Sequence, residues 1–411
     1  MEHTEELLPL AFTSEKSSII KVIGVGGGGC NAVNHMYRQG IKDVDFVVCN
    51  TDIQALKESP VPNKIQLGVQ TTEGLGAGAV PEIARRAAEE SSEQIEAILR
   101  DNTKMVFITA GMGGGTGTGA SPVVARIARE LGILTVGIVT IPFAFELEPK
   151  IRQALLGVAA LNEHVDALLV INNEKLWEID PNLNIKNAFN KADEVLSNAA
   201  KAIAEIVTVH GHINIDFADV YTTMKDGNVA IMNTGEASGE NRIKDAIENA
   251  LSSPLSNTDV KGANKILLNF YCSSADEHLI NIKELSVQVR EFTEKVGRNV
   301  GVIWGVTFDD KLEERVKITL IATGFDNSKI PGMPAKPVKL PENPVENPVE
   351  VPSNVKDIET LIKENYGPVP GSKTHQTEEI YINLDDLEDE NTLQEYEHTS
   401  ALQRRKLNLK R

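Results

Sequence analysis

Two glycine-rich segments constrain this chain more than any other feature of its sequence. They span residues 24–31 and 111–119, and each follows an apolar strand-like run and precedes a helical pattern. Because glycine has no Cβ, its backbone N–H groups can close on an anion, and the dipole of the following helix adds partial positive charge there. Two such segments in one domain predict a polyphosphate held from two sides, and therefore a nucleotide.

Length and charge narrow the class of protein. The 411 residues are enough for two domains with full-sized cores and an additional tail. The 41 basic and 59 acidic residues give a net charge of −18, which argues against a nucleic acid as the main partner. The three cysteines are too scattered for a disulfide framework or a metal cluster, so we expect a reducing, cytoplasmic setting. We also expect no signal peptide and no transmembrane segment.

The pattern from residue 19 to residue 212 predicts a first α/β domain after an N-terminal extension of residues 1–18. Near-continuous apolar strands alternate with helices, which is typical of a parallel sheet covered on both faces. A long helix is expected near residues 186–209, and Pro122 is expected in the first turn of a helix. The expected strands and other helices are Ile19–Val25, Phe46–Asn50, Met105–Ala110, Leu134–Thr140, Ala167–Ile171, Ala32–Gln39, Pro81–Arg100 and Pro122–Leu131.

A second, smaller α/β domain is expected over residues 213–327. Its strands are predicted at Lys265–Tyr271, Val300–Phe308 and Arg315–Thr323, with helices at Gly239–Leu251 and Ile282–Val296. Residues 328–376 are rich in proline and predict a disordered linker. Residues 377–411, acidic and then basic, form a predicted C-terminal tail.

The first glycine segment alone leaves two kinds of enzyme open. Gly24, Gly26 and Gly29 satisfy the G-x-G-x-x-G pattern of dinucleotide-binding oxidoreductases, with Asp52 as a distant ribose partner. A dinucleotide fold does not need the second segment, however, and no P-loop motif occurs. Neither segment contains a lysine, so phosphate charge would be met by backbone amides, hydroxyls and a metal ion.

Six segments, taken in order, resemble the nucleotide and catalytic motifs of the FtsZ family, the bacterial cell-division members of the tubulin-like GTPases. The resemblance extends from about residue 19 to residue 324, and the G-G-G-T-G-T-G segment is its most specific part. It implies a Rossmann-like three-layer GTPase domain joined by a long central helix to a smaller α/β domain, with a disordered C-terminal tail. The segments are Gly24–Asn31, Asn50–Asp52, Gly74–Ala79, Gly113–Gly119, Pro142–Glu146 and Asn214–Asp219.

The resemblance also implies which residues bind the nucleotide. Both glycine segments would wrap the phosphates of GTP or GDP, with Mg²⁺ as the companion ion and K⁺ left open as a further one. The loop of residues 74–79 would sense the γ-phosphate, and Glu146 with a following cation would meet the ribose. That cation is expected to be Arg152 rather than Lys150, because the spacing after Glu146 is longer than usual. The phosphate and ribose residues are Gly26, Gly27, Gly28, Gly29, Asn50, Asp52, Gly76, Ala77, Gly78, Gly113, Gly114, Gly115, Thr116, Gly117, Thr118, Gly119, Pro142, Glu146 and Arg152.

Four further residues would recognise guanine by the same resemblance: Asn31, Asn173, Phe189 and Asp193. A carboxylate can accept hydrogen bonds from N1–H and the exocyclic amine of guanine, which adenine cannot offer. An aromatic face can stack on the base. Without the family, Phe189 would be interpreted as a core residue on the inner face of a helix.

Asn214, Asp216 and Asp219 are the expected catalytic residues. From sequence alone they equally fit a solvated turn. The resemblance implies that this loop completes the site of the next subunit in a head-to-tail polymer, where the carboxylates polarise water or hold a cation beside the γ-phosphate. We expect no dedicated protein metal site.

The expected function is therefore a GTPase that polymerises into protofilaments and forms the division ring under the inner membrane at mid-cell. Its expected partners are other copies of itself and, through the C-terminal tail, membrane-tethering and division proteins. Two alternatives remain at this point: an NAD(P)-dependent oxidoreductase that uses the first glycine segment, and a non-catalytic tubulin-like filament scaffold.

Overall fold

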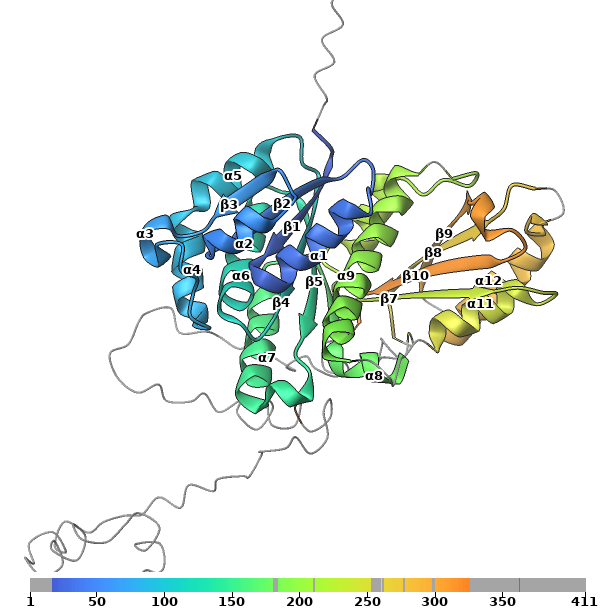
Figure 1. The fold of residues 1–411 in the computed structure, drawn as a ribbon. Helices are drawn as coiled ribbons and strands as arrows, with labels where there is room; N and C mark the ends of the chain where they lie inside the picture. Colours follow the sequence, from blue (N-terminus) through green and yellow to red (C-terminus); the bar gives the residue numbers. More distant parts are fainter. Residues whose placement is uncertain are drawn as a thin grey trace, which may run out of the picture. The chain divides into compact units, whose positions relative to one another are not determined.

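A mixed sheet organises the computed structural model of the protein (Figure 1). The structure describes residues 17–179, 184–209, 211–252, 260, 262–275, 278–297, 300–325 and 362. Within these residues, ten strands follow the order β3-β2-β1-β4-β5-β6-β7-β10-β8-β9. The strands are β1 Ile20–Val25, β2 Asp45–Asn50, β3 Asn63–Gln66, β4 Met105–Gly111, β5 Leu134–Ile141, β6 Ala167–Asn172, β7 Asn228–Ala237, β8 Lys265–Cys272, β9 Gly301–Phe308 and β10 Val316–Thr323.

Helices cover both faces of the sheet, as the apolar strands predict. One face carries α1, α9 and α10, and the other carries α4 to α7, α11 and α12. Side chains alternate between the two cores: Ile23 and Val25 of β1 face one, and Ile20 and Val22 face the other. The helices are α1 Gly26–Arg38, α2 Ile53–Glu58, α3 Val69–Thr72, α4 Pro81–Glu90, α5 Ser92–Arg100, α6 Gly115–Glu130, α7 Glu148–Asn162, α8 Leu176–Ile179, α9 Ile185–Thr208, α10 Phe217–Met224, α11 Arg242–Leu251 and α12 Ile282–Val296.

The two halves of the sheet meet at β6 and β7. Strands β1 to β6 are parallel, and β7 pairs with β6 through only Ala167–Asn228 and Leu168–Val229. Beyond this junction, β10 is antiparallel to both β7 and β8, and β8 is parallel to β9. The α/β class and the long central helix are confirmed, and α9 begins and ends within one residue of the predicted bounds.

Three expectations about the helices are wrong. The predicted helix of residues 81–100 is two helices, because the chain bends at Ser91, whose Oγ accepts the backbone N–H of Gly68 at 3.0 Å. Pro122 is the eighth residue of α6 and not part of its first turn. Helices α1 and α6 begin inside the glycine segments, at Gly26 and Gly115, and not after them.

Strands β3 and β7 were not predicted. β3 has only four residues, and β7 mixes buried with exposed positions and includes polar residues and a glycine. Neither strand shows the continuous apolar run by which the others could be recognised.

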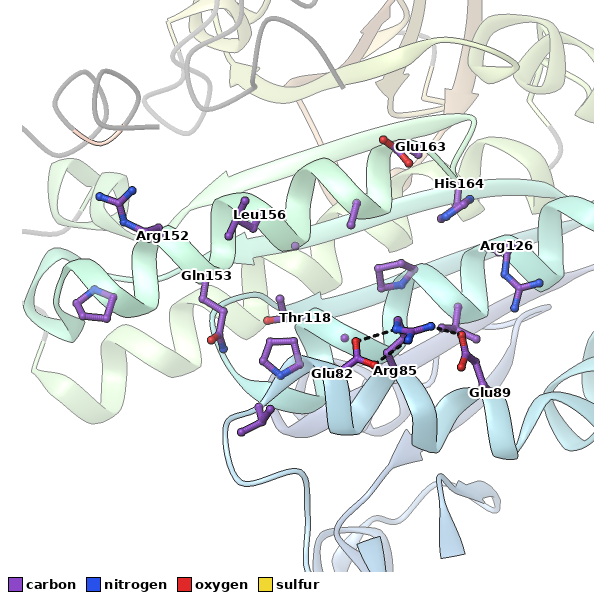
Figure 2. A pocket seen from close by; sticks show the side chains of 18 residues that line it. Glu82, Arg85, Glu89, Thr118, Arg126, Arg152, Gln153, Leu156, Glu163 and His164 are labelled. Atoms are coloured by element: carbon purple, nitrogen blue, oxygen red, sulfur yellow. Dashed lines mark hydrogen bonds and ion pairs between the residues drawn. The ribbon is translucent and has the colours of Figure 1, made fainter. Parts of the chain in front are cut away.

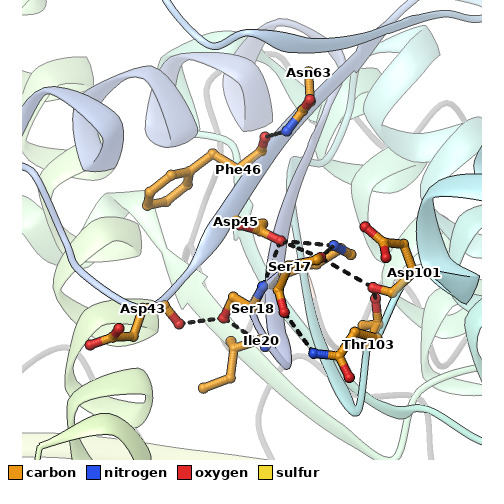
Figure 3. A network of polar contacts seen from close by, with 11 residues as sticks. Ser17, Ser18, Ile20, Asp43, Asp45, Phe46, Asn63, Asp101 and Thr103 are labelled. Carbon is orange, nitrogen blue, oxygen red and sulfur yellow. Dashed lines mark hydrogen bonds and ion pairs between the residues drawn. The ribbon is translucent and has the colours of Figure 1, made fainter. Parts of the chain in front are cut away.

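A polar network fixes the start of β1 at the amino edge of the sheet (Figure 3). Asp45 Oδ2 lies 2.9 Å from Lys21 Nζ and accepts from Ser17 Oγ at 2.8 Å and from the N–H of Ser18 at 3.0 Å. Burial acts to raise the pKa of Asp45, but the hydrogen bonds from Lys21 and Ser17 outweigh it and lower this pKa. This edge lies at the opposite end of the strands from the glycine segments.

The predicted linker and tail, and most of the N-terminal extension, lie outside the described residues. Ile362 is the exception within the linker, and its backbone is helical.

Candidate functional site

The two glycine segments meet at the carboxyl ends of β1 and β4, which are neighbouring parallel strands. Each opens a helix whose N-terminus has no side-chain cap: the residue before α1 is Val25, and the residue before α6 is Gly114. The first N–H groups of a helix have no partner within the helix, so two uncapped N-termini side by side offer converging donors and two positive dipole ends. This arrangement fits a chain of phosphates.

The glycines at the N-termini of α1 and α6 serve two different purposes. A Cβ on Gly26 would lie 2.7 Å from the backbone N of Gly117, and one on Gly29 would lie 2.2 Å from Thr109 O. These glycines allow the two segments and the sheet to touch. A Cβ on Gly27 or Gly114, in contrast, would meet nothing within 4 Å. The second pair therefore faces open space, where a ligand can approach the backbone.

Threonines tie the segments to their surroundings. Thr118 Oγ1 accepts the N–H of Gly113 at 2.9 Å, which fixes the turn into α6. Thr116 Oγ1 lies 2.7 Å from Thr51 Oγ1, so the second segment is bonded to the loop after β2. Thr51 was not singled out from the sequence, although it lies within the quoted Asn50–Asp52 motif.

The loop of residues 74–79 lies against both of these parts. Gly76 N–H donates to Thr51 O at 3.2 Å, and a Cβ on Gly115 would lie 3.0 Å from the Cβ of Ala77. Gly76 and Gly78 have φ of +89° and +57° with nothing near a Cβ, so they allow a left-handed path over open space. The structure therefore brings this predicted sensor loop to the start of α6.

Asn50 and Asp52 have structural contacts in this structure. Asn50 is buried, and its Oδ1 accepts the N–H of Asp52 at 3.3 Å. Asp52 caps α2 by accepting from Gln54 N–H at 2.8 Å. Both residues shape the loop beside the glycine segments, and their contact with a nucleotide stays a prediction.

An aromatic cluster borders the site where β5 leads into α7. The Phe189 ring packs edge-on against Phe143 at 5.4 Å and Phe145 at 6.4 Å between ring centroids. The Phe189 side chain is 41% exposed, so its packing leaves a large part of it accessible, unlike that of a core residue. Phe143 and Phe145 were not singled out from the sequence, although both lie in the quoted Pro142–Glu146 motif.

Asp193 follows Phe189 by one helical turn on α9. Burial raises the pKa of Asp193 to about 7, because the charged form loses hydration. Asn173 is also buried, and its Oδ1 has no hydrogen-bond partner among the described residues. A half-buried carboxyl and an orphaned amide oxygen can both accept hydrogen bonds from a ligand. Asn31, the remaining predicted guanine residue, is exposed on the first turns of α1.

The structure places Lys150 beside Glu146. Lys150 forms an ion pair with Glu146, and a Cβ on Gly113 would lie 2.9 Å from Lys150 Cγ and 2.8 Å from Pro142 Cγ. Arg152 instead pairs with Glu148 at 2.8 Å and lines a groove on another side of α7. The geometry therefore favours Lys150 over the predicted Arg152 as the cation nearest Glu146 and the glycines.

Gln153 is a site residue that the sequence analysis missed. Its Nε2 donates to Gly113 O at 3.0 Å, Gly114 O at 3.1 Å and Ala79 O at 3.2 Å. One side chain of α7 thus connects the second glycine segment to the end of the 74–79 loop. A glutamine on a helix carries no sequence signal for such a role.

The acidic triplet comes after the end of α9, and Phe189 and Asp193 lie near the start of this helix. Asp216 and Asp219 form a reciprocal capping box at the start of α10, with N–H to carboxylate distances of 2.9 and 3.1 Å. Asn214 Oδ1 accepts the N–H of Gly211 at 3.1 Å. Asp216 is exposed, and each aspartate uses one oxygen for the cap, which leaves the other available. The structure does not bring this triplet to the glycine segments of the same chain.

Two other kinds of feature are absent from the described residues. No group of three or more His, Cys, Asp or Glu side chains with the spacing of metal ligands occurs in this part of the chain. Among the helices of the same residues, none is long and apolar enough to cross a membrane.

Comparisons with known proteins agree with this geometry. The family model described as Tubulin/FtsZ family, GTPase domain, matches residues 19–181, and the model described as FtsZ family, C-terminal domain, matches residues 228–326. The cell division protein FtsZ of Porphyromonas gingivalis is 48% identical over 412 residues, which cover 97% of this chain and 88% of that protein.

Solved structures give the same result. An empty FtsZ dimer from M. jannaschii matches with a TM-score of 0.71 and 40% identity over 81% of this chain and 96% of that chain. A GTPγS-bound protofilament of CetZ2 from Haloferax volcanii matches with a TM-score of 0.63 over 74% of this chain and 92% of that chain. Its identity of 19% supports a shared fold alone.

Proposed function

Since this chain belongs to the FtsZ branch of the Tubulin/FtsZ family of GTPases, we propose that its two uncapped glycine helix ends hold the phosphates of GTP. The chain is a tubulin-like, filament-forming GTPase of cell division. Family membership sets aside the oxidoreductase and the non-catalytic scaffold. The observation that carries the assignment of the site is the open space beside Gly27 and Gly114, at two helix N-termini without side-chain caps.

In the proposed complex, guanine lies between Phe189 and Asp193. The exposed part of Phe189 offers a stacking surface. The Asp193 carboxylate accepts from N1–H and the exocyclic amine, and Asn173 provides a further acceptor. Glu146 and Lys150 lie on the path from this base site to the glycine segments and would meet the ribose.

Hydrolysis is proposed to use carboxylates from a second copy of the chain. Helix α9 rises by about 1.5 Å per residue, so Thr208 at its end is about 28 Å from Phe189 near its start. Asn214, Asp216 and Asp219 follow this far end and therefore cannot reach the nucleotide of their own chain. Stacking of one chain on the next would bring the triplet to a neighbour's γ-phosphate, and a head-to-tail contact that does not close produces a filament.

The chemical step is attack of water on the γ-phosphorus, which breaks the bond from this phosphorus to the β–γ bridging oxygen and releases GDP and phosphate. Asp216 and Asp219 each keep one oxygen outside the α10 cap, and these oxygens would orient the water and accept its proton.

Magnesium is proposed as the companion ion of GTP. The glycine segments contain no lysine, so backbone amides and the partly exposed hydroxyl of Thr116, which Thr51 positions, would face the phosphates with little formal positive charge. Mg²⁺ binds mainly through substrate phosphates and water, with few protein oxygens, and this donor set fits it. When bound, it neutralises charge on the phosphate oxygens. Phosphate release measured with and without K⁺ tests whether this ion takes part as well.

Two further parts of the proposal come from the sequence and the family. The protein acts in a ring at mid-cell beneath the inner membrane, and its C-terminal tail binds membrane-tethering and division proteins. The tail lies outside the described residues, so this part depends on the family alone.

The decisive experiment replaces Asp216 by Asn. Asparagine caps helices as well as aspartate does, so α10 should keep its start while the negative charge is lost. We expect GTP binding within about twofold of the wild type and phosphate release reduced by about a hundredfold, a typical loss for a group that acts in proton transfer. Filament pelleting is measured in the same samples.

Asp226→Asn is the matched control, because Asp226 is an exposed aspartate in the turn after α10. It should leave both binding and turnover unchanged. Normal phosphate release by assembled Asp216→Asn protein would refute the assigned role.

A further inference from the structure

Ile362 is buried although it lies in the proline-rich part of the sequence. Its side chain is 6% exposed and packs in a small cluster with Ile151 and Leu155 of α7, and Leu156 packs against this cluster. The cluster is separate from the two large cores that flank the sheet. One residue far along the chain therefore covers an apolar surface of the GTPase domain.

Helix α7 has two apolar surfaces. Ala154, Val158 and Leu161 belong to the sheet core, while Ile151 and Leu155 form the surface that Ile362 covers. Leu156 also lines a groove of about 670 Å³ between α4, α6 and α7 (Figure 2). The Ile362 cluster thus adjoins an open groove whose walls come from three helices of the GTPase domain.

The sequence around Ile362 has the pattern of an amphipathic helix. Apolar residues recur at Val355, Ile358, Leu361, Ile362 and Tyr366, which place them on one side of a helix. Asn354 before this run and Gly367 after it are preferred capping residues. No proline occurs between Pro352 and Pro368, although prolines are frequent on both sides. Ile362 itself has helical backbone conformation.

The chain can easily reach this position. The described part of the second domain ends at Phe325, and residues 326–361 connect it to Ile362. A flexible chain of this length spans roughly 30–35 Å on average. Such a tether gives an effective concentration on the order of millimolar, so even a weak contact is occupied in most molecules.

We propose that residues 355–366 form an amphipathic helix that docks on α7 of the same chain, with Ile362 against Ile151 and Leu155. The docked segment divides the C-terminal region into a closed loop, residues 326–354, and a free tail that starts at residue 367. The tail then departs from the GTPase domain and not from the end of the second domain. The surface of α7 formed by Ile151 and Leu155 is thus covered by a segment of the same chain.

Disulfide trapping tests the contact in the full-length protein. Leu155→Cys combined with Ile362→Cys is compared with Leu155→Cys combined with Thr360→Cys, which would lie on the opposite side of the helix. The native Cys30, Cys49 and Cys272 are buried, so they should compete little. After mild oxidation with diamide, we expect the first pair to yield a linked α7–tail peptide at least tenfold faster than the second.

The single variants Leu155→Cys and Ile362→Cys, mixed before oxidation, separate contact within a chain from contact between chains. Docking within one chain predicts little linkage in this mixture. Equally fast linkage in the two double variants, or linkage only between molecules, would overturn the proposal.

Hydrogen exchange gives a second, independent measurement that needs no change in α7. We expect amides of residues 355–366 to be protected in the wild type and to exchange at least tenfold faster in Ile362→Asp. Thr360→Asp adds the same charge on the opposite side and should retain protection. If the amides of this segment exchange at unprotected rates in the wild type, the proposal is wrong.

Discussion

The residue with the most informative titration is Asp193. Its folded pKa of about 7 lies above the ordinary value of 3.8, so the native state binds the extra proton between these two values. Its contribution to the free energy of unfolding therefore falls as pH rises from about 4 to 7. Guanine needs the ionised form, so nucleotide binding should favour loss of this proton.

Guanine nucleotide affinity is therefore expected to weaken by about tenfold between pH 8 and pH 6, because the ionised fraction of a group of pKa 7 falls by that factor. GDP titrations at several pH values, monitored by calorimetry, measure this slope. Asp193→Asn should bind weakly and lose the slope. Glu194→Gln, which changes the adjacent and more exposed carboxylate, should keep it. A flat profile for the wild type would contradict the assignment of Asp193.

The two classes of glycine should separate on substitution. In Gly29→Ala the new Cβ meets Thr109 O, and we expect the free energy of unfolding to fall by about 2 kcal/mol or more. In Gly27→Ala the methyl group enters open space, and stability should change by no more than about 1 kcal/mol. Its nucleotide affinity should nevertheless fall by about tenfold, since the phosphates need that space. Denaturant melts and nucleotide titrations of both variants measure the difference, and equal behaviour would disprove it.

The sequence shows where the glycines are, but it does not show which of them pack against neighbouring backbone and which face a ligand. That distinction depends on β1 and β4 being neighbours, which is a property of the sheet order. For the same reason the motif spacing predicts Arg152, whereas Lys150 lies next to Gly113: spacing does not show which side chain α7 turns toward this glycine.

Among the secondary-structure elements, the junction between β6 and β7 is the weakest part of the sheet, with two register pairs. A buried ion pair supports it. Asp166, whose side chain is 0% exposed, lies 2.7 Å from Lys225 Nζ and accepts the N–H of Thr135 at 2.9 Å. Asp166 precedes β6 and Lys225 precedes β7, so the pair connects the two halves where backbone pairing is sparse.

Asp166→Ala is expected to lower the free energy of unfolding by about 3 kcal/mol, because it leaves a buried N–H and a partly buried ammonium group without a partner. Asp226→Asn removes an exposed charge nearby, keeps a residue type that tolerates the φ of +52° there, and should cost no more than about 0.5 kcal/mol. Denaturant unfolding of the two variants at equal pH makes the comparison. Similar losses in both would show that the buried pair does not strengthen the junction.

The parallel strands of the first domain were largely predictable, apart from β3, whereas helices such as α7 and α10 were not predicted. Predominantly apolar segments identified β1, β2, β4, β5 and β6, because a strand buried on both faces has little freedom in composition. The break at Ser91 was not predictable, because it depends on a hydrogen bond to Gly68, more than twenty residues away.

At the scale of the whole molecule, the nucleotide residues lie at the carboxyl ends of β1 and β4 and near the start of α9, and the acidic triplet follows the end of α9. If each catalytic site needs residues from two chains, a mixture of two inactive variants should recover GTP hydrolysis. Asp216→Asn keeps a nucleotide site and Asp193→Ala keeps an acidic loop, so in a random 1:1 filament about a quarter of the contacts combine both. We expect phosphate release near a quarter of the wild-type rate in the mixture and little in either variant alone. No recovery in mixtures that still form filaments would contradict a shared site.

The placement of converging amides before α1 and α6 and of paired carboxylates beyond the end of α9 would also give any head-to-tail stack of these chains a direction. One terminus of the proposed polymer would present an uncovered nucleotide site, and the other would present exposed acidic turns. A regulator that blocks growth by binding one of these surfaces is therefore unable to recognise the opposite terminus, so the two can be controlled separately.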